Sequence, residues 1–299
     1  MISTTTALAV LAATAGLVSA APLAPRADDI DTTILQYALT LEHLENAFYS
    51  EALSMFDADA FASVGYKPWV RDRVVQIGQH EASHVAFLQT ALGDAATKPC
   101  NYSFGLAALD PKGFLGLSSV IENVGVSAYL GAASKITNPD YITAAGAILT
   151  VEARHQAWIT SVGLSASPWN GPYDTPLGFS DVYSIAAAFI TSCPDTNPTL
   201  PVKAFPAATV KETSYAAGDK ITLDFPTTGN SEALVVYSEL KSFFLPIASD
   251  ETVTLPEGLQ GIAYGVITTA GAAANVSDEN TVAGPVIFNF GLTSTEVSS

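Results

Sequence analysis

Two segments of the sequence repeat one arrangement of a glutamate and a histidine. Residues 81–88 read EASHVAFL and residues 152–159 read EARHQAWI, so in each a histidine follows a glutamate after three positions. Residues three apart share one face of a helix, so Glu81 with His84, and Glu152 with His155, can bind one metal centre. A single Glu-x-x-His is common, but two copies with matching neighbours indicate a shared function.

A second arrangement alternates with the first. Glu42 precedes Tyr49 by seven residues, and Glu122 precedes Tyr129 by seven. The order along the chain is therefore Glu, Glu-x-x-His, Glu, Glu-x-x-His, which predicts an internal duplication of a helical hairpin. For the two tyrosines, two interpretations stay open: they hydrogen-bond the glutamates of the site, or they pack in the core.

Glu45 lies one turn after Glu42 on nearly the same helix face. It is either the ligand in place of Glu42 or a hydrogen-bonding partner outside the ligand set. We prefer Glu42, because its spacing to Tyr49 matches the spacing of Glu122 to Tyr129.

The four glutamates are predicted to point into the core of a helical bundle. Residues one and two turns from each are mostly apolar, as Val74 and Ile77 are for Glu81. Buried ionised carboxylates are costly unless compensated, and these stripes carry no Lys or Arg. Two divalent ions would balance four carboxylates and two neutral imidazoles. The set suits iron or manganese, with zinc as a further candidate. The predicted ligands are Glu42, Glu81, His84, Glu122, Glu152 and His155.

Residues 80–84 also read HEASH, which satisfies the H-E-x-x-H pattern of zinc proteases. That alternative requires His80 and His84 to bind one zinc ion while Glu81 activates water. It leaves the second Glu-x-x-His and the paired Glu-Tyr spacing unexplained. We therefore place His80 beside the ligand face, and His43 likewise, with neither as a ligand.

Helical periodicity predicts four long helices over residues 31–56, 68–92, 111–135 and 138–162, and a shorter fifth over 180–192. Prolines then mark a linker. Beyond it, β-branched and aromatic runs separated by turn residues predict strands near residues 221–225, 233–237, 252–255, 262–268 and 286–290. The fold class is therefore α+β with several domains: a bundle over 31–195, a linker over 196–205 and a small antiparallel β-sandwich over 206–293.

The N-terminal residues predict export. Residues 1–20 have an apolar run and small residues at the end, as a signal peptide does, and 21–30 form a flexible leader. We expect no membrane anchor, because no other stretch is apolar enough to span a bilayer and the tail from residue 284 ends in polar residues. The net charge of -17 disfavours nucleic acid and anionic membranes as partners.

Two further features are typical of secreted proteins. The chain has two cysteines, Cys100 and Cys193, which we expect to pair in a disulfide. Asn101 and Asn275 stand in glycosylation sequons, so the protein is expected to be a glycoprotein, either extracellular or in the cell wall.

The helical part resembles the ferritin-like superfamily, and within it the secreted fungal ferritin-like-domain proteins related to stress-response and late sexual development proteins. Residues 28–195 carry the resemblance, with phrases such as LTLEHLE at 39–45 and the pair Phe48-Tyr49. The resemblance implies a ferritin-like antiparallel four-helix bundle with a dinuclear carboxylate site at the six predicted ligands.

The superfamily includes ferroxidases, oxygenases and manganese catalases, so the resemblance does not specify a reaction. We expect redox chemistry of two metal ions with O2 or peroxide, or metal handling in stress or development. The alternative is a non-catalytic structural or stress protein on the same fold. The β-sandwich and the oligomeric state receive no functional prediction.

Overall fold

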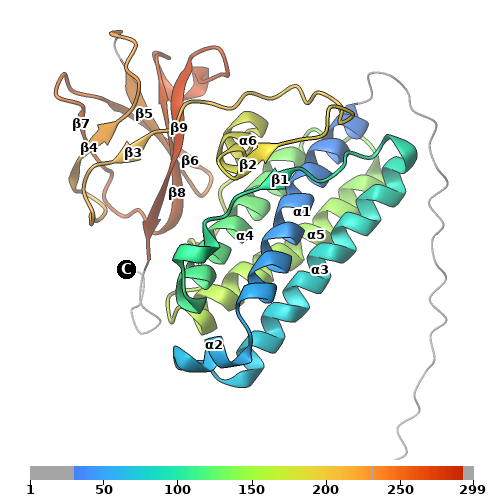
Figure 1. Cartoon of the computed structure of the whole chain (residues 1–299). Helices are drawn as coiled ribbons and strands as arrows, with labels where there is room; N and C mark the ends of the chain where they lie inside the picture. Colours follow the sequence, from blue (N-terminus) through green and yellow to red (C-terminus); the bar gives the residue numbers. More distant parts are fainter. Residues whose placement is uncertain (1–29, 231, 292–299) are drawn as a thin grey trace, which may run out of the picture.

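The computed structural model describes residues 30–291 except residue 231. The predicted signal peptide and residues 21–29 of the leader lie outside the described residues. Four long helices form a bundle, α1 (Ile30–Met55), α3 (Pro68–Leu92), α4 (Pro111–Ala133) and α5 (Pro139–Trp158), as Figure 1 shows. Helix α1 packs mainly on α3, and α4 packs mainly on α5. The predicted fold class, a helical bundle followed by antiparallel sheets, is confirmed.

The helix starts follow from residues that satisfy free backbone N–H groups. Asp110 precedes Pro111 and accepts a hydrogen bond from the N–H of Gly113, and Asn138 precedes Pro139 and accepts from Asp140. The short α2 (Ala58–Ser63), which was not predicted, is capped by Asp57 in the same way. Helix α5 continues as one wider turn over Ile159–Gly163, labelled η3.

The connection from α3 to α4 runs the length of the bundle and covers α1 (Figure 1). Short 3-10 turns, η1 (Gly93–Ala95) and η2 (Leu106–Ala108), stand at its two ends. Gln36 donates to the carbonyl of Ala95 and accepts from the N–H of Thr97, and the ring of His43 lies 3.0 Å from the carbonyl oxygen of Thr97. Helix α1 is therefore buried on nearly every side.

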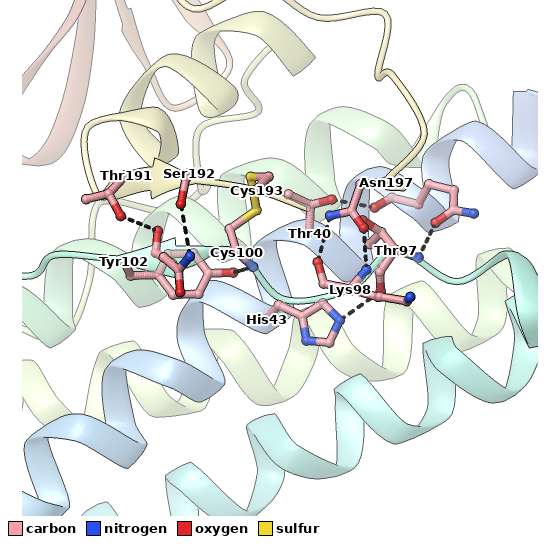
Figure 2. The surroundings of a disulfide bond; sticks show 12 residues. Thr40, His43, Thr97, Lys98, Cys100, Tyr102, Thr191, Ser192, Cys193 and Asn197 are labelled. Atoms are coloured by element: carbon pink, nitrogen blue, oxygen red, sulfur yellow. Dashed lines mark hydrogen bonds between the residues drawn. A yellow bond between two sulfur atoms is a disulfide. The ribbon is translucent and has the colours of Figure 1, made fainter. Parts of the chain in front are cut away.

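The predicted disulfide is confirmed. Cys100 and Cys193 are bonded, and next to them β1 (Asn101–Tyr102) pairs with β2 (Ile190–Ser192) (Figure 2). The side chain of Asn197 closes the same region by accepting from the N–H of Lys98 and donating to its carbonyl.

The predicted end of the fifth helix at residue 192 is wrong. Helix α6 (Phe179–Ala187) stops earlier, and Ile190–Ser192 is the strand β2. The physical reason is that this segment must extend to pair with β1 and to bring Cys193 to Cys100.

The C-terminal part consists of two antiparallel sheets. One has the order β3-β4-β7 and the other the order β6-β5-β8-β9. Apolar side chains such as Leu223, Ile267 and Phe288 fill the space between them. The strands β3 and β6 were not predicted. The bounds are β3 (Thr209–Val210), β4 (Lys220–Asp224), β5 (Ala233–Ser238), β6 (Lys241–Pro246), β7 (Thr252–Thr254), β8 (Gly261–Thr268) and β9 (Thr281–Phe290), with a 3-10 turn η4 (Ala273–Asn275).

The central strand β8 of the four-stranded sheet is buried on both faces. On β8, Ala263 and Ile267 belong to the core between the sheets, whereas Ile262 and Tyr264 belong to the core of the bundle. The hydroxyl of Tyr264 accepts from the side-chain amide of Asn123, 2.6 Å away on α4. The uninterrupted apolar run of residues 261–267 is the sequence signal for this burial on both faces. In a strand with one solvent-exposed face, apolar and polar residues would alternate instead. The sheet therefore packs directly on the bundle, with α6 beside it (Figure 1).

Candidate metal centre

The six predicted ligands come from all four long helices and meet inside the bundle. Glu42 comes from α1, Glu81 and His84 from α3, Glu122 from α4, and Glu152 and His155 from α5. All four glutamate side chains have 0% exposure. The apolar stripes of the sequence thus place the carboxylates inside the bundle, as predicted from their neighbours.

The first of two groups gathers around His84. Its Nδ1 atom lies 3.1 Å from Glu81 Oε2, 3.1 Å from Glu152 Oε1 and 3.3 Å from Glu42 Oε2. Three carboxylate oxygens therefore meet one ring nitrogen, which carries at most one proton. A cation among these four atoms would satisfy all of them.

The second group gathers around His155 in the same way. Its Nδ1 atom lies 3.1 Å from Glu81 Oε1, 3.2 Å from Glu122 Oε2 and 3.9 Å from Glu152 Oε2. Glu81 and Glu152 belong to both groups, with one oxygen directed to each histidine. The arrangement is that of two adjacent cation positions joined by two shared carboxylates.

Four carboxylate oxygens of this cluster are buried without a hydrogen-bond partner among the described residues: Glu42 Oε2, Glu81 Oε1 and both oxygens of Glu152. Nearly all buried polar atoms in proteins are paired, and an unpaired charged oxygen is especially unfavourable. All four face a histidine nitrogen at the centre. The residues present therefore fit two divalent ions held by carboxylates and imidazoles.

In the metal-free protein, burial and the mutual charges shift the protonation of Glu42, Glu152 and both histidines. Burial raises the pKa of Glu42 to about 7, although the ring of His84, 3.3 Å from its Oε2, opposes the increase. Burial, and then the charge of Glu81, raises the pKa of Glu152 well above its usual value. Burial alone lowers the pKa of His84 and of His155, but the carboxylates around them outweigh it and raise these pKa values to about 10 and about 9. Metal binding must displace such protons.

Glu42 and Glu122 each belong to one group only, and we call them the outer glutamates. Each tyrosine of the repeat donates a hydrogen bond to the outer glutamate of the other repeat. The hydroxyl of Tyr49 on α1 donates to Glu122 Oε1 on α4, and the hydroxyl of Tyr129 on α4 donates to Glu42 Oε1 on α1. Burial, followed by the charge of the glutamate, raises the pKa of both phenols well above the usual value, so both remain donors. Of the two interpretations of these tyrosines, the structure supports the hydrogen bonds.

Comparison with known proteins decides the family of the helical part. Residues 30–164 match the sequence profile of the ferritin-like domain. These residues form a ferritin-like domain. The chain is also similar to Protein rds1 of Schizosaccharomyces pombe, with 27% identity over 184 residues, 60% of this chain and 44% of the relative. The chain therefore spans less than half the length of that relative.

The ferritin-like domain buries a further carboxyl group beside the centre. Glu45 is 4% exposed and belongs to neither group around the histidines. Its Oε1 atom packs against Gly125: a Cβ atom at residue 125 would lie only 2.8 Å from it, so a larger residue there would crowd this carboxyl group. Burial, and then the charge of Glu42, raises the pKa of Glu45 well above its usual value, which favours its neutral form. Glu45 therefore accompanies the predicted ligands without joining them.

His80 is the site neighbour that the sequence left without a role. Its Nδ1 atom lies 2.9 Å from His155 Nε2, and the two rings stack with centroids 5.1 Å apart. The Nδ1 atom of His155 thus faces the carboxylates, and its Nε2 atom faces His80. His80 directly precedes Glu81 in the sequence, which places His80 on the helix face next to the ligand face. That position is the sequence feature that indicates a neighbour of the site. His43, by contrast, faces the carbonyl of Thr97.

An apolar hollow of the ferritin-like domain lies between the four long helices. Side chains of all four long helices line it, including Ala38, Leu88, Ala128 and Ala145, and Tyr129 is also among the lining residues. The hydroxyl of this Tyr129 donates to Glu42 Oε1, so one lining residue of the hollow contacts a predicted ligand. Among the described residues, no helix is long and apolar enough to cross a membrane.

Proposed function

We propose that the ferritin-like domain binds two divalent ions, iron or manganese, and supports redox chemistry with O2 or peroxide. The observation that carries the proposal is the set of four buried, unpaired carboxylate oxygens directed at two histidine nitrogens. Two Glu-x-x-His pairs with one glutamate from each remaining helix form the ligand pattern of di-iron and di-manganese carboxylate bundles. Oxygen and nitrogen ligands without thiolates suit these metals.

Each residue has a distinct part in this proposal. Glu42 and Glu122 each serve one metal position, and Glu81 and Glu152 serve both. Tyr49 and Tyr129 fix the second oxygen of the outer glutamates, which leaves the first free to bind metal. Bound iron or manganese would supply the electron transfer to O2 or peroxide. The apolar hollow beside Tyr129 offers small apolar molecules a dry approach.

The zinc-protease alternative has less support. It requires His80 and His84 on one metal ion, whereas His80 lies against the outer nitrogen of His155 and belongs to neither of the two ligand groups. Glu81, which would have to activate water, is fully buried and shared between the two groups.

Elemental analysis of protein purified without chelator tests the proposal. We expect about two Fe or Mn per chain, since each group offers one position, and loss of both metals in Glu81→Gln with Glu152→Gln. The matched control is Glu51→Gln, an exposed glutamate of α1, which should keep both metals. One zinc that survives the double substitution would favour the protease, and absence of metal in the unsubstituted protein would leave a non-catalytic structural role.

We also propose that the protein acts outside the cell. The disulfide between Cys100 and Cys193 supports this, because such bonds persist in oxidising compartments. Asn101 and Asn275 are both exposed, as glycosylation at these sites requires. Mass spectrometry of protein from culture medium tests the proposal: we expect a chain that begins near residue 21 and carries glycans. A full-length chain found only inside cells would contradict it.

A further inference from the structure

A second cavity lies between the bundle and the four-stranded sheet, away from the hollow at Tyr129. It measures ≈ 230 Å³, and its walls come from α4, from α5 with the loop that follows η3, and from β8 and β9. At a liquid volume of about 30 Å³ for each water molecule, it has room for roughly eight waters. Its polar walls are Ser119, Gln156, Thr160, Ser167, Asn170 and Asn289.

The lining combines apolar surface with polar side chains that carry no charge. None of the described residues that line the cavity is Asp, Glu, Lys, Arg or His. The chain has 29 acidic residues, and none of those that the structure describes lines this cavity. A charged ligand would lose hydration here without gaining a counter-charge, so the cavity favours a neutral ligand.

One wall is held rigidly by Asn170. Its Nδ2 donates to Asn123 on α4 and to Asp174, 2.9 Å away, and its Oδ1 accepts from the N–H of Ile262 on β8. Gly261 makes this contact possible, because a Cβ there would lie 2.2 Å from the Cα atom of Asn170. The loop is therefore fixed to both the bundle and the sheet, and the cavity is preformed.

Other polar groups of the cavity keep unused hydrogen-bonding capacity. Asn289 is exposed on β9, and its side-chain amide bonds no other described residue. Gln156 uses its Nε2 for Thr160, which leaves its Oε1 free to accept. An amide that both donates and accepts matches hydroxyl groups, which do the same.

Aromatic rings stand exposed at the same loop. Trp169 lines the cavity with 68% of its side chain exposed, and Tyr173, four residues on, is 57% exposed. Large rings are usually buried, and an exposed tryptophan with a polar neighbourhood provides a flat apolar platform. Ser165 in the same loop has a φ of 55°, a strained conformation for a serine.

We propose that this cavity binds a neutral sugar ring. The apolar C–H face of a pyranose lies on the ring of Trp169, and its hydroxyls bond the amides of Asn289 and Gln156. A purely apolar ligand would leave these amides unpaired, and an acidic or basic ligand would meet no counter-charge. The cavity shares no lining residue with the metal centre, so this proposal does not depend on the proposed redox function.

Saturation-transfer NMR on the full chain tests the proposal. The probes are the neutral trisaccharides of glucose, of mannose and of N-acetylglucosamine, with a trigalacturonate as the charged comparison. We expect saturable binding of at least one neutral probe with a Kd of about 1 mM or below, and none of the charged one. The probe that binds identifies the source of the sugar.

Substitutions locate the binding. Trp169→Ala should weaken it about tenfold or more, in line with loss of an aromatic anchor, and Asn289→Ala should weaken it independently. The matched control is Trp69→Ala, a 48% exposed tryptophan on α3, which should bind normally. Lack of saturable binding for every neutral probe, equal binding by Trp169→Ala, or preference for the charged probe would each overturn the proposal.

Discussion

Glu81 and Glu152 each direct one carboxylate oxygen to His84 and the other to His155. Each has one oxygen 3.1 Å from His84 Nδ1, and the other oxygen lies 3.1 Å from His155 Nδ1 for Glu81 and 3.9 Å for Glu152. Neither His84 nor His155 can pair with all the oxygens that face it. The two shared carboxylates therefore couple the two positions, and a change in either residue must affect both.

Single substitutions at shared and outer glutamates should differ in metal stoichiometry. Glu152→Gln should lower both metal equivalents, whereas Glu122→Gln should leave about one metal per chain, because only the group around His155 loses a carboxylate. Elemental analysis after dialysis measures this. Equal stoichiometry in the two variants would show that the positions are not shared as described.

The metal-free protein should lose stability as pH rises. The pKa of Glu42 is raised from 4.5 to about 7, and the pKa values of His84 and His155 are raised from 6.5 to about 10 and about 9. The folded chain thus binds more protons than the unfolded chain across these ranges. Its stabilisation is complete below the unfolded values and is lost as pH rises through the folded ones.

Thermal unfolding in chelator should accordingly give a higher Tm near pH 5.5 than near pH 8. Added manganese should raise the Tm more at the higher pH, where fewer protons compete. A metal-free Tm that is constant or increases over this interval would contradict the protonated cluster.

Tyr129→Phe should destabilise the fold by about 1 to 3 kcal/mol, because it leaves the buried Oε1 of Glu42 without its donor. Tyr49→Phe should behave alike through Glu122. The control is Tyr173→Phe, whose side chain is 57% exposed and which should change little. Urea unfolding measures all three, and equal stability of the Tyr129 variant and the control would refute the hydrogen-bond role.

Removal of the disulfide should lower stability without removing metal. Cys100 and Cys193 are 93 residues apart, and the chain-entropy model gives about 4 to 5 kcal/mol as the upper effect of closing such a loop. Cys100→Ser with Cys193→Ser should therefore shift the urea midpoint down, as reduction of the unsubstituted protein should. Gln36 and His43 still hold the connecting segment on α1, so metal content should persist. Loss of metal would show that the disulfide positions the centre.

Much of the fold was predictable because local residues specify it. Asp110-Pro111 and Asn138-Pro139 cap α4 and α5, and apolar periodicity gave the extent of α3. The strand β2 was not predictable from Ile190–Ser192 alone, because its partner β1 is some ninety residues away in the chain and the two meet only in the folded structure, next to the disulfide. The burial of β8 on both faces likewise depends on Asn123 and Ser127 of α4.

For the candidate site, the repeated motifs identified which residues meet but not how their atoms are oriented. The spacing of Glu42 to Tyr49 favoured Glu42 over Glu45, and Glu45 lies outside both groups around the histidines. The pairing of each tyrosine with the glutamate of the other repeat, and the stacking of His80 on His155, depend on how the hairpins dock. Helix periodicity carries no information on that docking.

Anomalous diffraction from crystals of the protein purified without chelator tests the central claim most directly. We expect two peaks inside the bundle at the iron or manganese edge, one among Glu42, Glu81, His84 and Glu152 and one among Glu81, Glu122, Glu152 and His155. A single zinc peak bound by His80 and His84, or no peak in fully ordered helices, would contradict it.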